Sequence, residues 1–285
     1  MHLQSIFIVS VPRSGSTLLT NLLDSNDDVI CPPESFFPAV LEMLDASEMR
    51  DRRKIAALFV VSCSDGSPLT LDEAEVCIRP DKHETLDALA IAIARKLGRD
   101  PDKIRTVVWK FTRMVGCCKF AADIGGKFIV LHRNPLNVYE SQFRVPFGEK
   151  NKNPLRFALF AASYDIAFKE YPKDRLLQLD YPQIPQRLAE IVRWIGSSGT
   201  SRELSTGNQK AVSDENPWHS NINKPFDNRD AEKLGNLKWW QRAGFHMGRT
   251  ILNQLGPLAK KARCLADQRQ MSALRSQASK LLTHP

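Results

Sequence analysis

The sequence predicts an α/β protein with a central parallel sheet flanked by helices, in the three-layer P-loop-like arrangement. Apolar, β-branched segments predict strands near residues 4–10, 105–110, 127–132 and 175–180, and helical patterns lie between them. Such alternation favours parallel strands with helices on both faces of the sheet. The 285 residues, 42% of them hydrophobic and 25% charged, have the composition of one folded domain over 1–285. Ligands of such sheets bind at the carboxyl ends of the strands.

The elements are predicted in the following order. A strand, a turn and a helix occupy 4–25, and a loop with two prolines follows the helix. Helices are predicted at 38–62 and at 84–97, the second ending at Gly98, and strands at 105–110 and 127–132. A helix follows Pro135, and a loop at 144–154 leads to a helix at 155–170. A strand at 175–180 and a helix at 184–195 come next. Residues 197–236 are predicted as a long loop, and Lys238 begins the last helical region.

The turn after the first strand has the composition of an anion-binding site. Residues 12–19 read Pro-Arg-Ser-Gly-Ser-Thr-Leu-Leu and lead into a helix, whose N-terminal N–H groups and dipole favour a negative charge. A Walker A loop would begin with glycine and carry a lysine before its hydroxyl residue. Here the cation is Arg13, which suits bidentate contact with a phosphate. The turn therefore predicts a phosphate or sulfate site rather than a site for a magnesium-bound triphosphate.

Residues 12–19 resemble the 5′-phosphosulfate loop of sulfotransferases that use 3′-phosphoadenosine 5′-phosphosulfate (PAPS), in the arginine form of the tyrosylprotein and carbohydrate branch. Residues 127–141 resemble the 3′-phosphate site of the same family, with an arginine at the strand end and a serine eight residues later. The resemblance covers 3–35, 105–145 and 175–245 and leaves a basic helical region at 246–285. It implies cofactor contacts from Arg13, Ser14, Gly15, Ser16, Thr17, Arg133 and Ser141.

The resemblance also implies roles for four other residues. Glu34 corresponds to the general base of tyrosylprotein sulfotransferases, and Lys110, with Arg13, would meet the transferring sulfuryl group. Tyr181 would lie near the adenine, and Lys224 would come from a late loop over the 3′-phosphate. Three of them have a structural alternative: Glu34 could cap the following helix, Lys110 could extend into solvent from a strand end, and Tyr181 could be a core residue.

The sequence thus predicts sulfuryl transfer from PAPS to a hydroxyl acceptor, with Glu34 as the base, 3′-phosphoadenosine 5′-phosphate (PAP) as the product and no metal. The acceptor class stays open among carbohydrate, metabolite, lipid and peptide tyrosine. One alternative is a P-loop nucleotide kinase. Another is a non-enzymatic protein that binds a 3′-phosphorylated nucleotide or nucleic acid.

Charge and cysteine content restrict the setting. The net charge is +8, and basic residues gather at 260–280, where a solvated helix face is expected rather than a nucleic-acid contact. The six cysteines form no Cys-x-x-Cys pair, so we expect free thiols in a reducing, cytoplasmic compartment. Neither a membrane span nor a targeting presequence is expected. A homodimer is left open.

Overall fold

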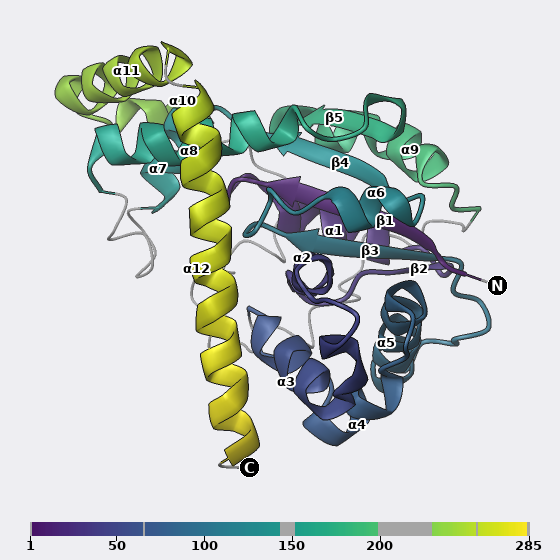
Figure 1. Cartoon of the computed structure of the whole chain (residues 1–285). Coiled ribbons are helices and arrows are strands. Elements are labelled where there is room, and N and C mark those ends of the chain that lie inside the picture. The colour runs from purple at the N-terminus through teal and green to yellow at the C-terminus, as the bar shows by residue number, and fades with distance from the viewer. Residues whose placement is uncertain (1, 65, 143–151, 199–229, 255, 284–285) are drawn as a thin grey trace.

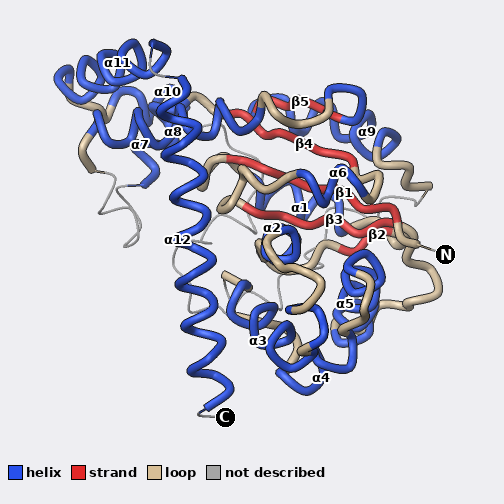
Figure 2. Tube along the Cα trace, in the orientation of Figure 1, coloured by secondary structure: helices blue, strands red, loops and turns tan. Residues whose placement is uncertain are grey.

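One parallel sheet organises the chain. The computed structural model describes residues 2–64, 66–142, 152–198, 230–254 and 256–283. The strands are β1 (Gln4–Ser10), β2 (Val29–Ile30), β3 (Thr106–Phe111), β4 (Lys127–His132) and β5 (Leu176–Asp180), and they pair in the order β2-β3-β1-β4-β5 (Figure 2). The parallel sheet is as predicted, and the four predicted strands lie within a residue or so of the observed ones.

The sheet is buried on both faces, because its strands are apolar at consecutive positions. Successive side chains of a strand point to opposite faces. In β1, Phe7 and Val9 join the larger core cluster, whereas Ile6 and Ile8 join the smaller cluster on the other face. All four are fully buried. Near-continuous hydrophobic strands of this kind are typical of parallel sheets that helices cover on both sides.

The helices form layers against these two faces (Figure 1). The smaller cluster lies beneath α1 (Ser16–Asp24) and α9 (Ile184–Trp194). The larger cluster includes residues of α2 (Phe37–Glu42), α3 (Arg52–Ser62), α4 (Leu71–Cys77), α5 (Lys82–Lys96) and α6 (Lys119–Asp123). The remaining described helices are α7 (Pro135–Gln142), α8 (Pro154–Phe168), α10 (Asp230–Gly235), α11 (Trp239–Gln254) and α12 (Gly256–Thr283).

The predicted helical segment at 38–62 is wrong as a continuous element. α2 ends at Glu42, a 3₁₀ turn covers Glu48–Arg50, and α3 begins only after Asp51. The Asp51 carboxylate accepts a bond from the Lys54 N–H, as an N-cap does. The Asp45 carboxylate accepts hydrogen bonds from the N–H groups of Ser47 and Glu48, at the start of the 3₁₀ turn. These aspartates favour turns and caps over a helix interior, which explains the break.

Four short strands and helices were not predicted, one of which, α10, lies within the segment 197–236 that was predicted as a loop. β2 has two residues, and α6 has five, so neither has a detectable period. α4 begins with a capping box, in which the Thr70 hydroxyl accepts from the Glu73 N–H and the Glu73 carboxylate accepts from the Thr70 N–H. The Thr-x-x-Glu spacing was readable in the sequence.

The basic C-terminal region forms α11 and the long helix α12, which packs on α3 and α8 (Figure 1). One stripe of α12 is buried, consisting of Asp267, Met271, Leu274 and Ala278. Basic side chains of α12 pair with carboxylates at Glu170, Asp267 and Glu48. No helix in the described part of the chain is both long and apolar enough to cross a membrane. None of the six cysteines forms a disulfide.

Candidate active site

The carboxyl ends of three neighbouring strands bring the predicted cations together. Arg13 follows β1, Lys110 is the penultimate residue of β3, and Arg133 comes directly after β4. Since β3, β1 and β4 are adjacent and parallel, their ends lie side by side at one edge of the sheet. The sheet therefore assembles in space a cluster of positive charge that is dispersed in the sequence.

The turn between β1 and α1 is held in an uncommon backbone conformation. Arg13 has a φ of 76° and Gly15 a φ of 95°, and the Ser14 N–H donates to the Val11 carbonyl at 3.2 Å. A positive φ costs a non-glycine residue roughly 1–3 kcal/mol and is found most often at functional sites. Within the described residues, no side chain caps the N-terminus of α1. Its first N–H groups are therefore suited to an anion.

Tyr181 lies against this turn. It begins a 3₁₀ turn (Tyr181–Gln183) directly after β5. A Cβ atom added to Gly15 would lie 2.3 Å from Cδ2 of Tyr181, so only glycine permits this approach. The Arg133 guanidinium lies 3.9 Å from the centroid of the tyrosine ring. The structure thus brings Tyr181 to the predicted site, between the turn and Arg133.

Glu34 and Lys110 form an ion pair beside the turn. Glu34 Oε2 and Lys110 Nζ are 3.0 Å apart. Lys110 also donates to the Thr17 hydroxyl at 3.1 Å, and the Thr112 hydroxyl donates to Glu34 Oε1 at 2.6 Å. Lys110 is 5% exposed, so the alternative of a solvent-exposed lysine at the strand end is wrong. The ammonium, the carboxylate and a residue of the turn are therefore in direct contact.

The helix-capping alternative for Glu34 is also wrong. The N-cap of α2 is Phe36, and the Phe37 N–H is bonded instead to the Ser35 hydroxyl. Main-chain bonds hold the Glu34 segment against its neighbours: the Ser35 N–H donates to the Lys110 carbonyl, and the Ser64 N–H donates to the Glu34 carbonyl. The carboxylate is thereby directed toward Lys110 and Thr112.

The environment of Glu34 keeps it ionised. Burial alone would raise the pKa of this carboxyl, but the Lys110 ammonium and the bond from Thr112 outweigh it and hold the pKa below its usual value. A carboxylate that is charged and partly shielded from water has the state that a general base requires.

Arg133 and Ser141 meet at Arg13 rather than at each other. Arg133 Nη1 donates to the Arg13 carbonyl at 3.1 Å, and Arg13 Nε donates to the Ser141 hydroxyl at 3.3 Å. Burial and then the neighbouring Arg133 charge lower the pKa of Arg13. Arg13 therefore connects the predicted 5′ and 3′ parts of the site, a contact that the sequence spacing did not suggest.

Two charged residues of α10 near this cluster were not predicted from the sequence. Asp230 Oδ1 accepts from Nε and Nη2 of Arg133, at 3.0 and 2.5 Å. Lys233 is also near this cluster, since burial and then the charge of Arg133 lower its pKa to about 8. Residue 230 is 97 positions from Arg133, and no local pattern reveals such a distant contact. The predicted Lys224 lies outside the described residues.

Thr112 was also missed, although a signal existed. It lies two residues beyond Lys110 and directly follows β3. In extended chain, residues two apart point to the same side. The Thr112 hydroxyl, two residues from Lys110, was therefore a candidate for the same site as the lysine.

The turn with its uncapped helix N-terminus, the buried Glu34–Lys110 ion pair and the clustered arginines thus lie together at the carboxyl edge of a parallel sheet, where α/β folds bind their ligands. The sequence profile of the sulfotransferase family matches residues 5–198, more than half of the chain. The chain therefore belongs to the sulfotransferase family, and the protein is a transferase of that class.

The solved structures that are similar to this chain include two sulfotransferase domains. The sulfotransferase domain of the Synechococcus PCC 7002 olefin synthase is 19% identical with a TM-score of 0.53, and the alignment covers 88% of this chain and 95% of that one. The sulfotransferase domain of the curacin biosynthetic pathway is 19% identical with a TM-score of 0.52, covering 89% and 99%. These likenesses show the sulfotransferase fold. No curated protein matches the chain significantly in sequence.

Proposed function

We propose that the protein transfers a sulfuryl group from PAPS to a hydroxyl of an acceptor. The observation that carries this proposal is the contact chain Glu34–Lys110–Thr17, which joins an ionised carboxylate to an anion-binding turn. A P-loop kinase needs a Walker lysine, and the turn at residues 12–19 has none. A protein that only binds nucleotides has no need of a buried carboxylate that is paired with a lysine.

The residues fit the donor by their charge and by the uncapped N–H groups at the start of α1. Arg13, the N–H groups at the start of α1 and the hydroxyls of Ser16 and Thr17 would hold the 5′-phosphosulfate. Ser14 belongs to the same turn. Arg133 and Ser141 would hold the 3′-phosphate, and Tyr181 would lie beside the adenine. PAPS supplies the sulfuryl group: a new sulfur–oxygen bond forms to the acceptor while the bond to the 5′-phosphate oxygen breaks, and PAP leaves.

Glu34 would take the proton of the acceptor hydroxyl. General-base help of this kind contributes on the order of 10²–10⁴ in rate. When Glu34 becomes neutral, its ion pair with Lys110 loses most of its attraction. The Lys110 ammonium is then available for the charge that develops on the leaving oxygen, together with Arg13. Each such preorganised donor is worth roughly 3–4 kcal/mol.

The test is a calorimetric titration with PAP, AMP and ATP, first without Mg²⁺. We expect PAP to bind at least about tenfold more tightly than AMP, because charge-assisted hydrogen bonds to the 3′-phosphate contribute about 1.5–3 kcal/mol. Equal affinity for PAP and AMP, or a preference for Mg-ATP, would contradict the proposal.

The acceptor is then sought with sulfur-labelled PAPS and a panel of carbohydrate, metabolite, lipid and tyrosine-peptide hydroxyls. Label in one acceptor class, absent with Glu34→Gln, identifies the substrate. Tight PAP binding with no label in any class would point instead to a nucleotide-binding role.

A further inference from the structure

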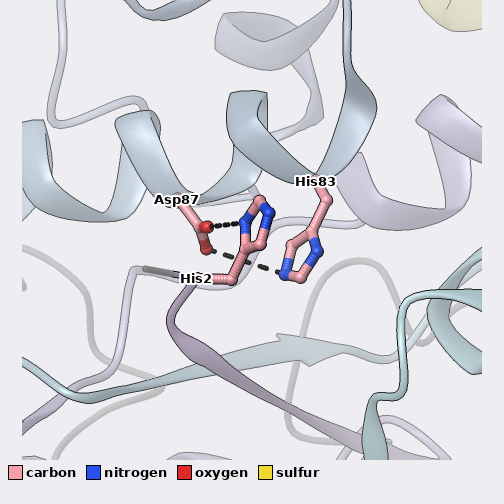
Figure 3. A group of neighbouring side chains, drawn as sticks. All are labelled: His2, His83 and Asp87. Carbon is pink, nitrogen blue, oxygen red and sulfur yellow. Dashed lines mark hydrogen bonds and ion pairs between the residues drawn. The ribbon is translucent and has the colours of Figure 1, made fainter.

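A second cluster of reactive side chains lies at the opposite edge of the sheet from the candidate active site. His2 precedes β1, whereas Arg13 follows it, so the length of a seven-residue strand, roughly 20 Å, separates the two places. His83 and Asp87 project from α5 toward His2 (Figure 3). Because His83 and Asp87 are four residues apart, they lie on one face of that helix.

The three side chains bring their ligand atoms to one place. One atom from each, two imidazole nitrogens and a carboxylate oxygen, all lie within 4.8 Å of one another. Nδ1 of His2 is 2.8 Å from Oδ2 of Asp87, and the two imidazole rings stack with centroids 4.1 Å apart. His2 is half exposed, so the cluster is open to solvent on one side.

Two buried atoms in this cluster lack a hydrogen bond. Nε2 of His83 and Oδ1 of Asp87 face each other at 3.9 Å, which is longer than a hydrogen bond. Neither atom has a hydrogen-bond partner among the described residues, and both are shielded from solvent. Buried polar atoms in folded proteins nearly always have a partner, so such a pair is suited to share a bound water or ion.

We propose that His2, His83 and Asp87 bind a divalent transition-metal ion of the Zn²⁺ class. Imidazole nitrogen and carboxylate oxygen are ligands of Zn²⁺ at about 2.0–2.2 Å, and three protein ligands leave a fourth position for water. Two ligand atoms on one tetrahedral ion of this kind lie about 3.3 Å apart. The observed separations of 2.8 and 3.9 Å, each to a different oxygen of Asp87, bracket that value, and the three ligand atoms lie within 4.8 Å of one another, so the side chains would draw closer together to hold one ion.

The ion would join the start of the central strand to α5. It would be structural rather than catalytic, because it lies at the edge away from Glu34 and Lys110. Since binding to the folded state alone stabilises it, saturating Zn²⁺ should raise the melting temperature by several degrees.

The experiment uses the chain without a polyhistidine tag, stripped with EDTA and desalted. A Cys264→Ser background is used because the exposed Cys264 thiol is itself a zinc ligand. Calorimetric titration with ZnCl₂ should show one equivalent bound. His83→Ala and Asp87→Asn should each weaken binding at least about tenfold, the loss that even an outer-shell partner can cost. His246→Ala, at an exposed histidine on α11, is the matched control and should leave binding unchanged.

Circular dichroism establishes that each variant is folded before it is titrated. Co²⁺ provides an independent measurement, because visible bands without a thiolate charge-transfer band indicate nitrogen and oxygen ligands. Absence of saturable binding, or the same affinity in His83→Ala and Asp87→Asn as in the parent, would overturn the proposal and leave a bridging water at the cluster.

Discussion

The two halves of the candidate active site are stabilised in different ways. The transfer half, Glu34 with Lys110, Thr17 and Thr112, is held by contacts among early elements around the sheet. In the nucleotide half, Arg133 is bound by Asp230, which comes from a much later helix. Under the proposed function the base, Glu34, is already charged in the transfer half, whereas Arg133 would have to exchange the Asp230 carboxylate for a phosphate. Chemistry and cofactor affinity should therefore respond to different substitutions.

The largest effect should come from the base of the transfer half. Glu34→Gln should lower kcat by about 10²–10⁴, because the amide cannot accept the acceptor proton. PAP affinity should change by no more than about twofold. Steady-state kinetics and calorimetry measure the two quantities separately. A parallel loss of turnover and PAP affinity would contradict a base role for Glu34 and would show that the two halves of the site do not respond separately.

A pH profile sharpens the same contrast. Because the pKa of Glu34 is lowered, its carboxylate stays ionised as the pH falls to its ordinary value of 4.5 and is protonated only below it. We expect no loss of kcat/KM from this group between pH 8 and 5. If kcat/KM instead falls on the acid side with a midpoint above pH 5, and this fall is absent in Glu34→Gln, the folded environment does not lower the pKa of Glu34.

The nucleotide half should control discrimination between PAP and AMP. Arg133→Ala should weaken PAP binding by about 10–100-fold, since charge-assisted hydrogen bonds are worth about 1.5–3 kcal/mol. AMP lacks the 3′-phosphate and should lose much less affinity. Arg187→Ala, at a surface arginine paired with Glu190, is the control. An equal loss for the two nucleotides would assign Arg133 to the 5′ side.

Asp230 should act in the opposite direction. Asp230→Asn removes the carboxylate that competes with a phosphate for Arg133, so PAP should bind several-fold more tightly. Asp174→Asn removes an exposed carboxylate beside Arg175 and serves as the control. If Asp230→Asn weakens PAP binding, then Asp230 orients Arg133 rather than competing for it.

The smallest effect should come from Lys233. Its pKa of about 8 means that the ammonium is charged at pH 7 and neutral at pH 9. PAP affinity should therefore fall a few-fold as the pH rises through 8. Lys233→Arg keeps the charge at both pH values and should remove this step in calorimetric titrations at pH 7, 8 and 9. Persistence of the step in that variant would assign it to another group.

Much of this architecture could be predicted because local rules determine it. Continuous apolar strands predict a buried parallel sheet, and the carboxyl ends of such strands meet at one edge. Arg13, Lys110 and Arg133 were therefore placed correctly without any contact information. β2 was too short to carry a period. The break at Asp45 and Asp51 required turn chemistry to be weighed against a largely apolar pattern.

Contacts between distant segments could not be predicted. Asp230 reaches Arg133 across 97 residues, and nothing in its own segment distinguishes it from a solvated aspartate. The bond between Arg13 and Ser141 likewise depends on how α7 packs beside the turn. Thr112 is different, since its spacing from Lys110 was sufficient to suggest it.

The buried stripe of α12 has a consequence for folding during synthesis. Met271, Leu274 and Ala278 belong to the same core cluster as residues of α3 and α8. Those two helices leave the ribosome long before α12 does, so part of their apolar surface stays exposed to water in the nascent chain. Until α12 emerges, that surface is available to chaperones and to other unfinished chains.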